Sequence, residues 1–353
     1  MNIVILAGGL AHRLWPLTID YPKALLRIAG KPTLYHLLEN LSHVPDADNM
    51  IIAVDSDKKQ YFIDEIDSWN IVSKVKPILS SHSLEKDGSL KGPLRKISEI
   101  LENSEDLDMT NDATLVVGSD NVFGFPINDF CAFFRDKEKK SCVAIQKFLE
   151  PVDSSQFGVP TIDKDGRLTG FIEKPREQKY QQRSTACYIF LPEDICRVKK
   201  FLSSGEKDEL GKFITWLWPQ TELVSYQFQK NWYDIGSRDG ILAANAFLMQ
   251  YDLQKRKEPN ITQGKITIIP PVFVDENALL SDSTIGPNVY IESKAVINGS
   301  NIQNSIIYKN AKVQGCNLRN SIVGEDSIIE GNISEAIFGP RTRIVDEHIE
   351  NGS

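Results

Sequence analysis

Residues 2–9 read Asn-Ile-Val-Ile-Leu-Ala-Gly-Gly, an apolar run that stops at two glycines. A short apolar run that ends in glycine predicts a buried strand followed by a tight loop. Further apolar runs predict strands at Met50–Val54 and Ala113–Val117. Apolar residues at helical spacing predict helices at Leu34–Leu41 and Gly92–Leu101. Because strands alternate with helices, we expect an α/β fold with a Rossmann-like mixed sheet and helices on both faces.

The last quarter of the chain has a different pattern, in which aliphatic residues recur every five or six positions. Ile285, Ile291 and Ile297 are six residues apart, and Ser305–Asn310 aligns with Ser321–Asp326 sixteen residues on. Three faces of five or six residues make one coil, so the spacing predicts a triangular parallel β-helix with Asn and Gly at the tight turns. A β-sandwich is the alternative interpretation.

These two patterns predict the domain organisation of the chain. The α/β domain is expected over residues 1–245, a helix end and polar linker over residues 246–264, and the β-helix domain over residues 265–353. The linker is inferred from the polar stretch Gln254–Gly264, which separates the two kinds of apolar spacing.

Composition excludes several classes of protein. The 353 residues carry 40 Lys and Arg against 48 Asp and Glu, a net charge of −8, which argues against a general nucleic-acid binder. Hydrophobic residues make up 41%, as in ordinary globular proteins, and no run reaches the roughly 18 apolar residues of a membrane helix. The five cysteines include no C-x-x-C pair, so we expect neither a disulfide framework nor a zinc site. We therefore expect a cytoplasmic protein.

The loop after the first strand carries phosphate-binding chemistry. Residues 6–18 read Leu-Ala-Gly-Gly-Leu-Ala-His-Arg-Leu-Trp-Pro-Leu-Thr, and Pro22 and Lys23 follow. Glycines let backbone N–H groups approach phosphate oxygens, Arg13 adds a planar group with several donors, and Lys23 adds a point charge. Together they suit a triphosphate. The spacing differs from G-x-G-x-x-G and from the Walker motif, which disfavours a dinucleotide fold or a P-loop.

This stretch resembles the signature of sugar-1-phosphate nucleotidylyltransferases, Leu-Ala-Gly-Gly-x-Gly-Thr-Arg-Leu-x-Pro-Leu-Thr followed by Pro-Lys. Gly118–Asn121, Phe171–Pro175 and Trp232–Ser237 resemble later motifs of the same family, in the same order. Several branches of the family also carry a C-terminal left-handed β-helix. The resemblance covers nearly the whole chain. It implies the reaction of an NTP with a sugar 1-phosphate to give an NDP-sugar and pyrophosphate, with Mg²⁺ as cofactor.

The resemblance assigns roles to the residues that match its motifs. Those that would bind the nucleotide are Leu6, Ala7, Gly8, Gly9, Ala11 and Gly92. The catalytic residues at the phosphates would be Arg13 and Lys23, and the Mg²⁺ ligands would be Asp120 and Asp234. Those that would bind the sugar phosphate are Gly158, Glu173 and Lys174. A sugar phosphate is already an anion near neutral pH, so positioning and electrostatic stabilisation are expected to dominate, without a general base.

Two departures from the family pattern keep a second class of function open. Ala11 stands where the family has Gly, and Ser89–Leu94 replaces a segment that reads Gly-Thr-Ala-Gly-Ala-Leu and frames the base. If Ala11 adopts a positive φ, the cost is about 1 kcal/mol or more. The alternative is a non-catalytic regulatory or sensor subunit.

The substrates expected from overall resemblance are dTTP or UTP with glucose 1-phosphate, and the closest alternative is a mannose-1-phosphate guanylyltransferase. An acyl-transferring β-helix is disfavoured because the C-terminal region holds a single histidine, His348. Partners are expected to be the substrates and further copies of the chain, with a homo-oligomer formed through the flat faces of the β-helix.

Overall fold

The computed structural model describes the chain except for residues 10, 70, 72, 74, 86, 104–110, 137–139, 178, 252–260 and 346–353. By their internal contacts the residues form two compact units. The first comprises Met1–Gly9 with Leu34–Trp232, and the second comprises Leu10–Thr33 with Tyr233–Ser353. Within the predicted helix end and linker over residues 246–264, residues 252–260 lie outside the described residues, and the predicted domain boundaries stay a prediction.

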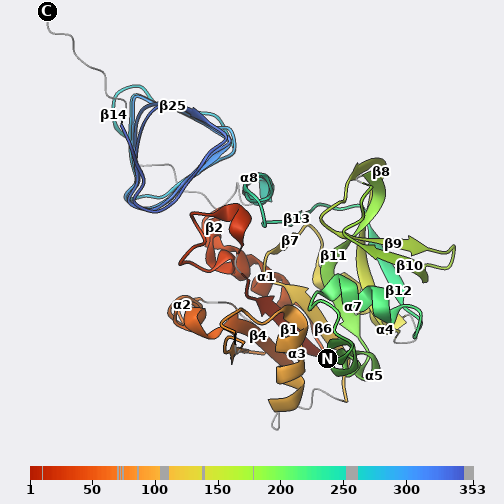
Figure 1. Ribbon diagram of the computed structural model, residues 1–353. Helices are drawn as coiled ribbons and strands as arrows, with labels where there is room; N and C mark the ends of the chain where they lie inside the picture. The colour runs from red at the N-terminus through yellow and green to blue at the C-terminus, as the bar shows by residue number, and fades with distance from the viewer. Residues whose placement is uncertain are drawn as a thin grey trace, which may run out of the picture. The chain divides into compact units, whose positions relative to one another are not determined.

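A seven-stranded mixed sheet forms the centre of the first unit (Figure 1). Its strands, in spatial order, are β12 (Val224–Phe228), β8 (Cys142–Asp153), β11 (Lys179–Phe190), β6 (Thr114–Gly118), β1 (Asn2–Ala7), β4 (Asn49–Asp55) and β5 (Pro77–His82). Strand β1 pairs in parallel with both β4 and β6, whereas β11 runs antiparallel to β6 and β8. The carboxyl ends of β1, β4 and β6 therefore lie at one edge, where ligands of such sheets bind.

Helices of the first unit pack their apolar sides against this sheet. They are α1 (Thr33–Leu41), α2 (Lys59–Ile66), α3 (Pro93–Asn103), α4 (Ile127–Asp136), α5 (Pro192–Ile195), α6 (Val198–Ser203) and α7 (Leu210–Leu217). One buried cluster joins sheet residues Val4, Ile51 and Val116 to Ile97 of α3 and Phe213 of α7. A short ribbon of β9 (Gly158–Ile162) with β10 (Leu168–Glu173) and the strand β7 (Asn121–Phe123) complete the unit, and β13 (Trp232–Asp234) begins at its last residue, Trp232. The predicted α/β fold class is confirmed.

The second unit combines the N-terminal signature segment, helix α8 (Arg238–Tyr251) and the β-helix. The segment holds a 3-10 turn at His12–Leu14, another at Lys23–Leu25, and the hairpin β2 (Arg27–Ile28) to β3 (Lys31–Pro32). Asn245, which is buried in α8, accepts a hydrogen bond of 2.9 Å from the backbone N–H of Ala29 through its Oδ1. The Tyr308 hydroxyl of the β-helix donates to the carbonyl of Arg27 at 3.1 Å. Contacts distant in sequence therefore fix this segment.

The β-helix consists of short parallel strands, seen end on as a triangle in Figure 1. Its strands are β14 (Ile261–Gln263), β15 (Thr267–Ile268), β16 (Val272–Val274), β17 (Leu279–Ser281), β18 (Thr284–Ile285), β19 (Val289–Ile291), β20 (Val296–Asn298), β21 (Asn301–Gln303), β22 (Ser305–Ile307), β23 (Lys312–Arg319), β24 (Ile322–Val323), β25 (Ile328–Ser334), β26 (Ile337–Phe338) and β27 (Arg343–Ile344). Tyr290 pairs with Ile306, and Ile306 with Ile322, which is the sixteen-residue repeat. The parallel β-helix is thus confirmed.

Aliphatic residues fill the interior of the coils and asparagines line one corner. Ile285, Ile291 and Ile297 are fully buried in one cluster, as their spacing predicts. Asn304 and Asn320 have φ values of 43° and 48°, and the side-chain amide of Asn304 donates to that of Asn320 at 2.8 Å. Asparagine tolerates left-handed backbone, so it suits these turns. Within the described residues, no helix is both long enough and apolar enough to cross a membrane.

Candidate active site

The two glycines of the loop after β1 have different local environments. Gly9 has a φ of +122°, a backbone conformation that residues with a Cβ rarely adopt. A Cβ on Gly8 would lie 1.9 Å from Lys96 Nζ and 2.7 Å from Asp55 Oδ2. A side chain at position 9 would therefore strain the backbone, and a side chain at position 8 would displace Lys96 and Asp55.

Asp55 and Lys96 are functional candidates that sequence reasoning missed. Asp55 ends β4 and Lys96 lies in the first turns of α3, and the Lys96 ammonium pairs with Asp55 Oδ1. The other carboxylate oxygen, Oδ2, accepts a hydrogen bond of 3.1 Å from the N–H of Gly9. The sequence predicts that glycine N–H groups of this loop face phosphate, whereas in this structure the N–H of Gly9 donates to Asp55. The sequence signal for this pair was Lys96, a charged residue directly before the apolar Ile97 in a predicted helix.

Ala11 adopts the left-handed conformation that the family motif led us to consider. Its φ and ψ are 45° and 43°. The carbonyl of Ala11 accepts hydrogen bonds from Leu14 N at 2.9 Å and from Thr18 Oγ1 at 3.0 Å. These bonds stabilise the turn His12–Leu14, which contains Arg13.

Arg13 and Asp234 come together at Gly236, within the second unit. A Cβ on Gly236 would lie 2.6 Å from Asp234 Oδ1 and 3.0 Å from Arg13 Nη2. The N–H of Gly236 also donates to Asp234 Oδ1 at 2.5 Å. A predicted phosphate-binding cation and a predicted metal ligand therefore share one glycine-lined space. Lys23 begins the turn Lys23–Leu25 in the same unit.

Asp120 follows the end of β6 and is held by its neighbour Asn121. The Asn121 Nδ2 donates to the carbonyl of Gly118 and to Asp120 Oδ1, both at 2.9 Å. The indole N–H of Trp232 donates in turn to Asn121 Oδ1 at 2.8 Å. A Cβ on Gly118 would lie 2.7 Å from Asp120 Oδ1, so a side chain there would displace this carboxylate. Asn121 thus fixes the carboxylate of Asp120.

The predicted sugar-phosphate residues form a compact cluster. Lys174 Nζ lies 3.8 Å from Glu173 Oε1 and 3.4 Å from Glu209 Oε2. A Cβ on Gly158 would lie 3.0 Å from Glu173 Oε2, and a Cβ on Gly211 would lie 1.8 Å from the same oxygen. The Glu173 side chain is 11% exposed, and this burial raises the pKa of its carboxyl group. The cluster thus packs a carboxylate against two glycines beside a lysine.

Lys174 also has a φ of 49°. A left-handed backbone conformation costs a residue with a Cβ of order 1–3 kcal/mol, and it persists where the surrounding structure imposes it. The N–H of Lys174 donates to the carbonyl of Phe157 at 3.1 Å, which is one such constraint.

Gly92 lies at the start of α3 against Asp208. A Cβ on Gly92 would lie 2.3 Å from Asp208 Cγ. Asp208 accepts hydrogen bonds from Leu94 N at 2.7 Å and from Arg95 N at 3.3 Å, so it caps the helix from a distant loop. Burial raises the pKa of the Asp208 carboxyl group. Gly92 and Asp208 line a cleft of about 560 Å³ together with Ser89 and Leu90, which belong to the segment that differs from the family pattern.

The predicted site residues are divided between the two units. The first unit holds Leu6, Ala7, Gly8, Gly9, Gly92, Asp120, Gly158, Glu173 and Lys174. The second unit holds Ala11, Arg13, Lys23 and Asp234. Each predicted Mg²⁺ ligand is thus fixed by hydrogen bonds in a separate unit.

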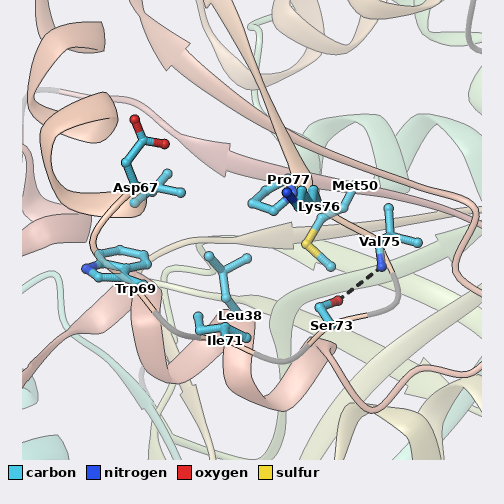
Figure 2. A pocket seen from close by; sticks show the side chains of 10 residues that line it. Leu38, Met50, Asp67, Trp69, Ile71, Ser73, Val75, Lys76 and Pro77 are labelled. Carbon is cyan, nitrogen blue, oxygen red and sulfur yellow. Dashed lines mark hydrogen bonds between the residues drawn. The ribbon is translucent and has the colours of Figure 1, made fainter.

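A second cavity, of about 270 Å³, lies elsewhere in the first unit (Figure 2). Leu38, Met50 and Trp69 give it an apolar lining, and Asp67 and Lys76 add charges. None of the predicted site residues is among the described residues that line it. It is therefore separate from the candidate site.

Comparison with known proteins identifies the family. A family model described as nucleotidyl transferase matches residues 2–251, and the chain belongs to this family. The mannose-1-phosphate guanylyltransferase catalytic subunit beta of Drosophila melanogaster is 30% identical over 282 residues, which are 79% of this chain and 70% of that protein. Mannose-1-phosphate guanylyltransferase 1 of Arabidopsis thaliana is 27% identical over 300 residues, which are 84% and 78% of the two chains.

A solved structure shares the fold. A Bacillus anthracis protein described as a glucose-1-phosphate thymidylyltransferase superposes with a TM-score of 0.58 at 22% identity, over 70% of this chain and 94% of the other. The predicted enzyme class, nucleotidyltransferase, is confirmed by the family match.

Proposed function

We propose that the chain transfers a guanylyl group from GTP to mannose 1-phosphate and releases pyrophosphate. The observation that carries the proposal is the similarity to two mannose-1-phosphate guanylyltransferases over 79% and 84% of this chain. The overall resemblance of the sequence instead favours dTTP or UTP with glucose 1-phosphate as the main substrates. The Bacillus anthracis protein described as a glucose-1-phosphate thymidylyltransferase is 22% identical to this chain. This level of identity supports the fold and carries no argument about the substrate.

Asp120 and Asp234 fit a magnesium ion by their chemistry. Both are carboxylates that follow or end a strand, and each has its Oδ1 fixed by a hydrogen bond, from Asn121 and from Gly236. Magnesium binds through one or two carboxylates together with substrate phosphates. When bound, the ion would supply positive charge that offsets the charge of the phosphates.

The chain's own residues would act by binding and charge neutralisation. Arg13 would stabilise the outer phosphates of the nucleotide, and Lys23 the phosphates near the reacting centre. Lys174 would neutralise the phosphate of the sugar, since its ammonium already lies within 4 Å of two carboxylates that hold it in place. Glu173 would accept hydrogen bonds from sugar hydroxyls. We also retain a cytoplasmic location and a homo-oligomer as predictions.

The decisive experiment is a pyrophosphate-release assay with Mg²⁺. GTP, dTTP and UTP are each combined with mannose 1-phosphate and with glucose 1-phosphate. We expect turnover with GTP and mannose 1-phosphate. Turnover with dTTP or UTP and glucose 1-phosphate instead would overturn the proposed substrates, and a folded chain that binds nucleotide without any turnover would favour the regulatory subunit.

Variants of the proposed metal ligands test the site independently of the substrate. Asp120→Asn and Asp234→Asn should lower turnover at least a hundredfold. The matched control is Asp57→Asn, whose side chain is 52% exposed and lies outside the candidate site. Wild-type turnover in either of the first two variants contradicts their assignment.

A further inference from the structure

A buried ion pair lies directly against the loop that is expected to receive the nucleotide. The side chains of Lys96 and Asp55 are 3% and 7% exposed. They come from α3 and from the end of β4, and neither belongs to the motifs of the family signature. The Lys96 ammonium fills the space that a Cβ on Gly8 would occupy.

Stability alone is a weak reason for such a pair. Taking two charges out of water costs several kcal/mol for each ion, and apolar replacements of a buried pair are often as stable or more stable. A buried ion pair is better explained when its geometry fixes something nearby. Here Asp55 uses both oxygens, with Oδ1 on Lys96 and Oδ2 on the N–H of Gly9.

The pair and the loop therefore form one hydrogen-bonded unit. Lys96 fixes the carboxylate of Asp55, the carboxylate fixes Gly9, and the ammonium occupies the space beside Gly8 that a Cβ would need. Gly9 has a φ of +122°, and glycine has more conformations to lose than any other residue. A charged acceptor at its N–H offsets that loss, because hydrogen bonds to charged groups are the stronger ones.

We propose that Asp55 and Lys96 are positioning residues that hold the Gly8–Gly9 loop in the conformation that binds the nucleotide. The inference rests on the proposed function in one respect, namely that this loop receives the nucleotide. The pair acts through the loop, so it should affect nucleotide affinity and leave the affinity for sugar 1-phosphate unchanged.

Two double variants separate positioning from simple stability. Asp55→Asn/Lys96→Met removes both charges and keeps an oxygen that can accept from the N–H of Gly9. Asp55→Leu/Lys96→Met removes both charges and this acceptor as well. Neither variant leaves a buried charge without a partner, so each should fold, and thermal unfolding confirms this before any other measurement.

The first measurement is amide hydrogen exchange over residues 2–9, which needs no ligand. We expect at least tenfold faster exchange at the loop in Asp55→Leu/Lys96→Met, and exchange close to wild type in Asp55→Asn/Lys96→Met. The second measurement is calorimetric binding of Mg²⁺ with GTP, dTTP and UTP. We expect at least tenfold weaker binding in the leucine variant and a change under threefold in the asparagine variant.

The outcomes distinguish the inference from the proposed function. If the wild type binds a nucleotide and the leucine variant binds it equally well, the positioning role is wrong while the proposed function stands. If the leucine variant has a raised KM for both the nucleotide and the sugar 1-phosphate by the same factor, the pair has only a general structural role. If the wild type binds none of the three nucleotides, both the proposed function and the inference are wrong.

Discussion

Replacing Ala11 by glycine should stabilise the protein, against the usual direction of such substitutions. Ala11 has φ 45° and ψ 43°, the left-handed region, which costs an L-residue about 1–2 kcal/mol. Glycine removes that cost but gains freedom in the unfolded chain, worth about 0.4–1 kcal/mol. The two hydrogen bonds to the Ala11 carbonyl involve the backbone and remain. The expected net gain is about 0.5–1 kcal/mol, or roughly 1–3 °C in the unfolding temperature.

Differential scanning calorimetry of Ala11→Gly measures this gain. The matched control is Ala132→Gly in the interior of α4, where glycine should cost about 1 kcal/mol. The two variants should therefore shift the transition in opposite directions. If Ala11→Gly lowers the unfolding temperature as the control does, the left-handed strain at this position does not exist and the reasoning is wrong.

Three further predictions concern the sugar-phosphate cluster and the helix cap beside it. Gly211→Ala would place a Cβ 1.8 Å from Glu173 Oε2, so the Glu173 carboxyl group would have to move and the KM for sugar 1-phosphate should rise, and an unchanged KM in steady-state assays would contradict the cluster's role. Asp208→Ala removes the cap of α3, and urea unfolding should show a loss of about 0.5–2 kcal/mol, whereas no loss would mean that the cap is dispensable. Burial raises the folded-state pKa of Glu173, so its ionisation opposes folding and stability should fall as pH rises from the ordinary glutamate range through the raised value. Glu173→Gln should flatten this fall in urea titrations at several pH values, and an identical slope in the variant would refute the assignment.

Local patterns were enough to predict the elements that carry the site. The run at residues 2–7 became β1, and the helical spacing at Leu34–Leu41 became α1 with one further residue at its start. The sixteen-residue repeat predicted the β-helix, because each aliphatic residue stacks on its copy in the next coil. Ala11 could be singled out from the motif, because the family has Gly at its position and glycine suggests a positive φ.

Partners distant in sequence could not be predicted in this way. The space beside Gly8 is filled by Lys96, and the cap of α3 comes from Asp208, 114 residues from Leu94. Spacing along the chain records which residues share a face of one element, but it does not record which elements meet. The same limit applies to the signature segment, which belongs with the β-helix unit through contacts such as that of Tyr308 with Arg27.

Four consecutive residues connect two predicted binding regions of the first unit. Asp208 caps α3 beside Gly92, which is predicted to bind the nucleotide. Glu209 pairs with Lys174, and Gly211 leaves the space that the Glu173 carboxylate occupies. A displacement of this segment should therefore disturb both predicted binding regions, whereas loss of the Asp55–Lys96 pair should disturb the Gly8–Gly9 loop alone. Helix α3 thus links the two predicted binding regions, with Lys96 on its body supporting the Gly8–Gly9 loop and Asp208 capping its beginning.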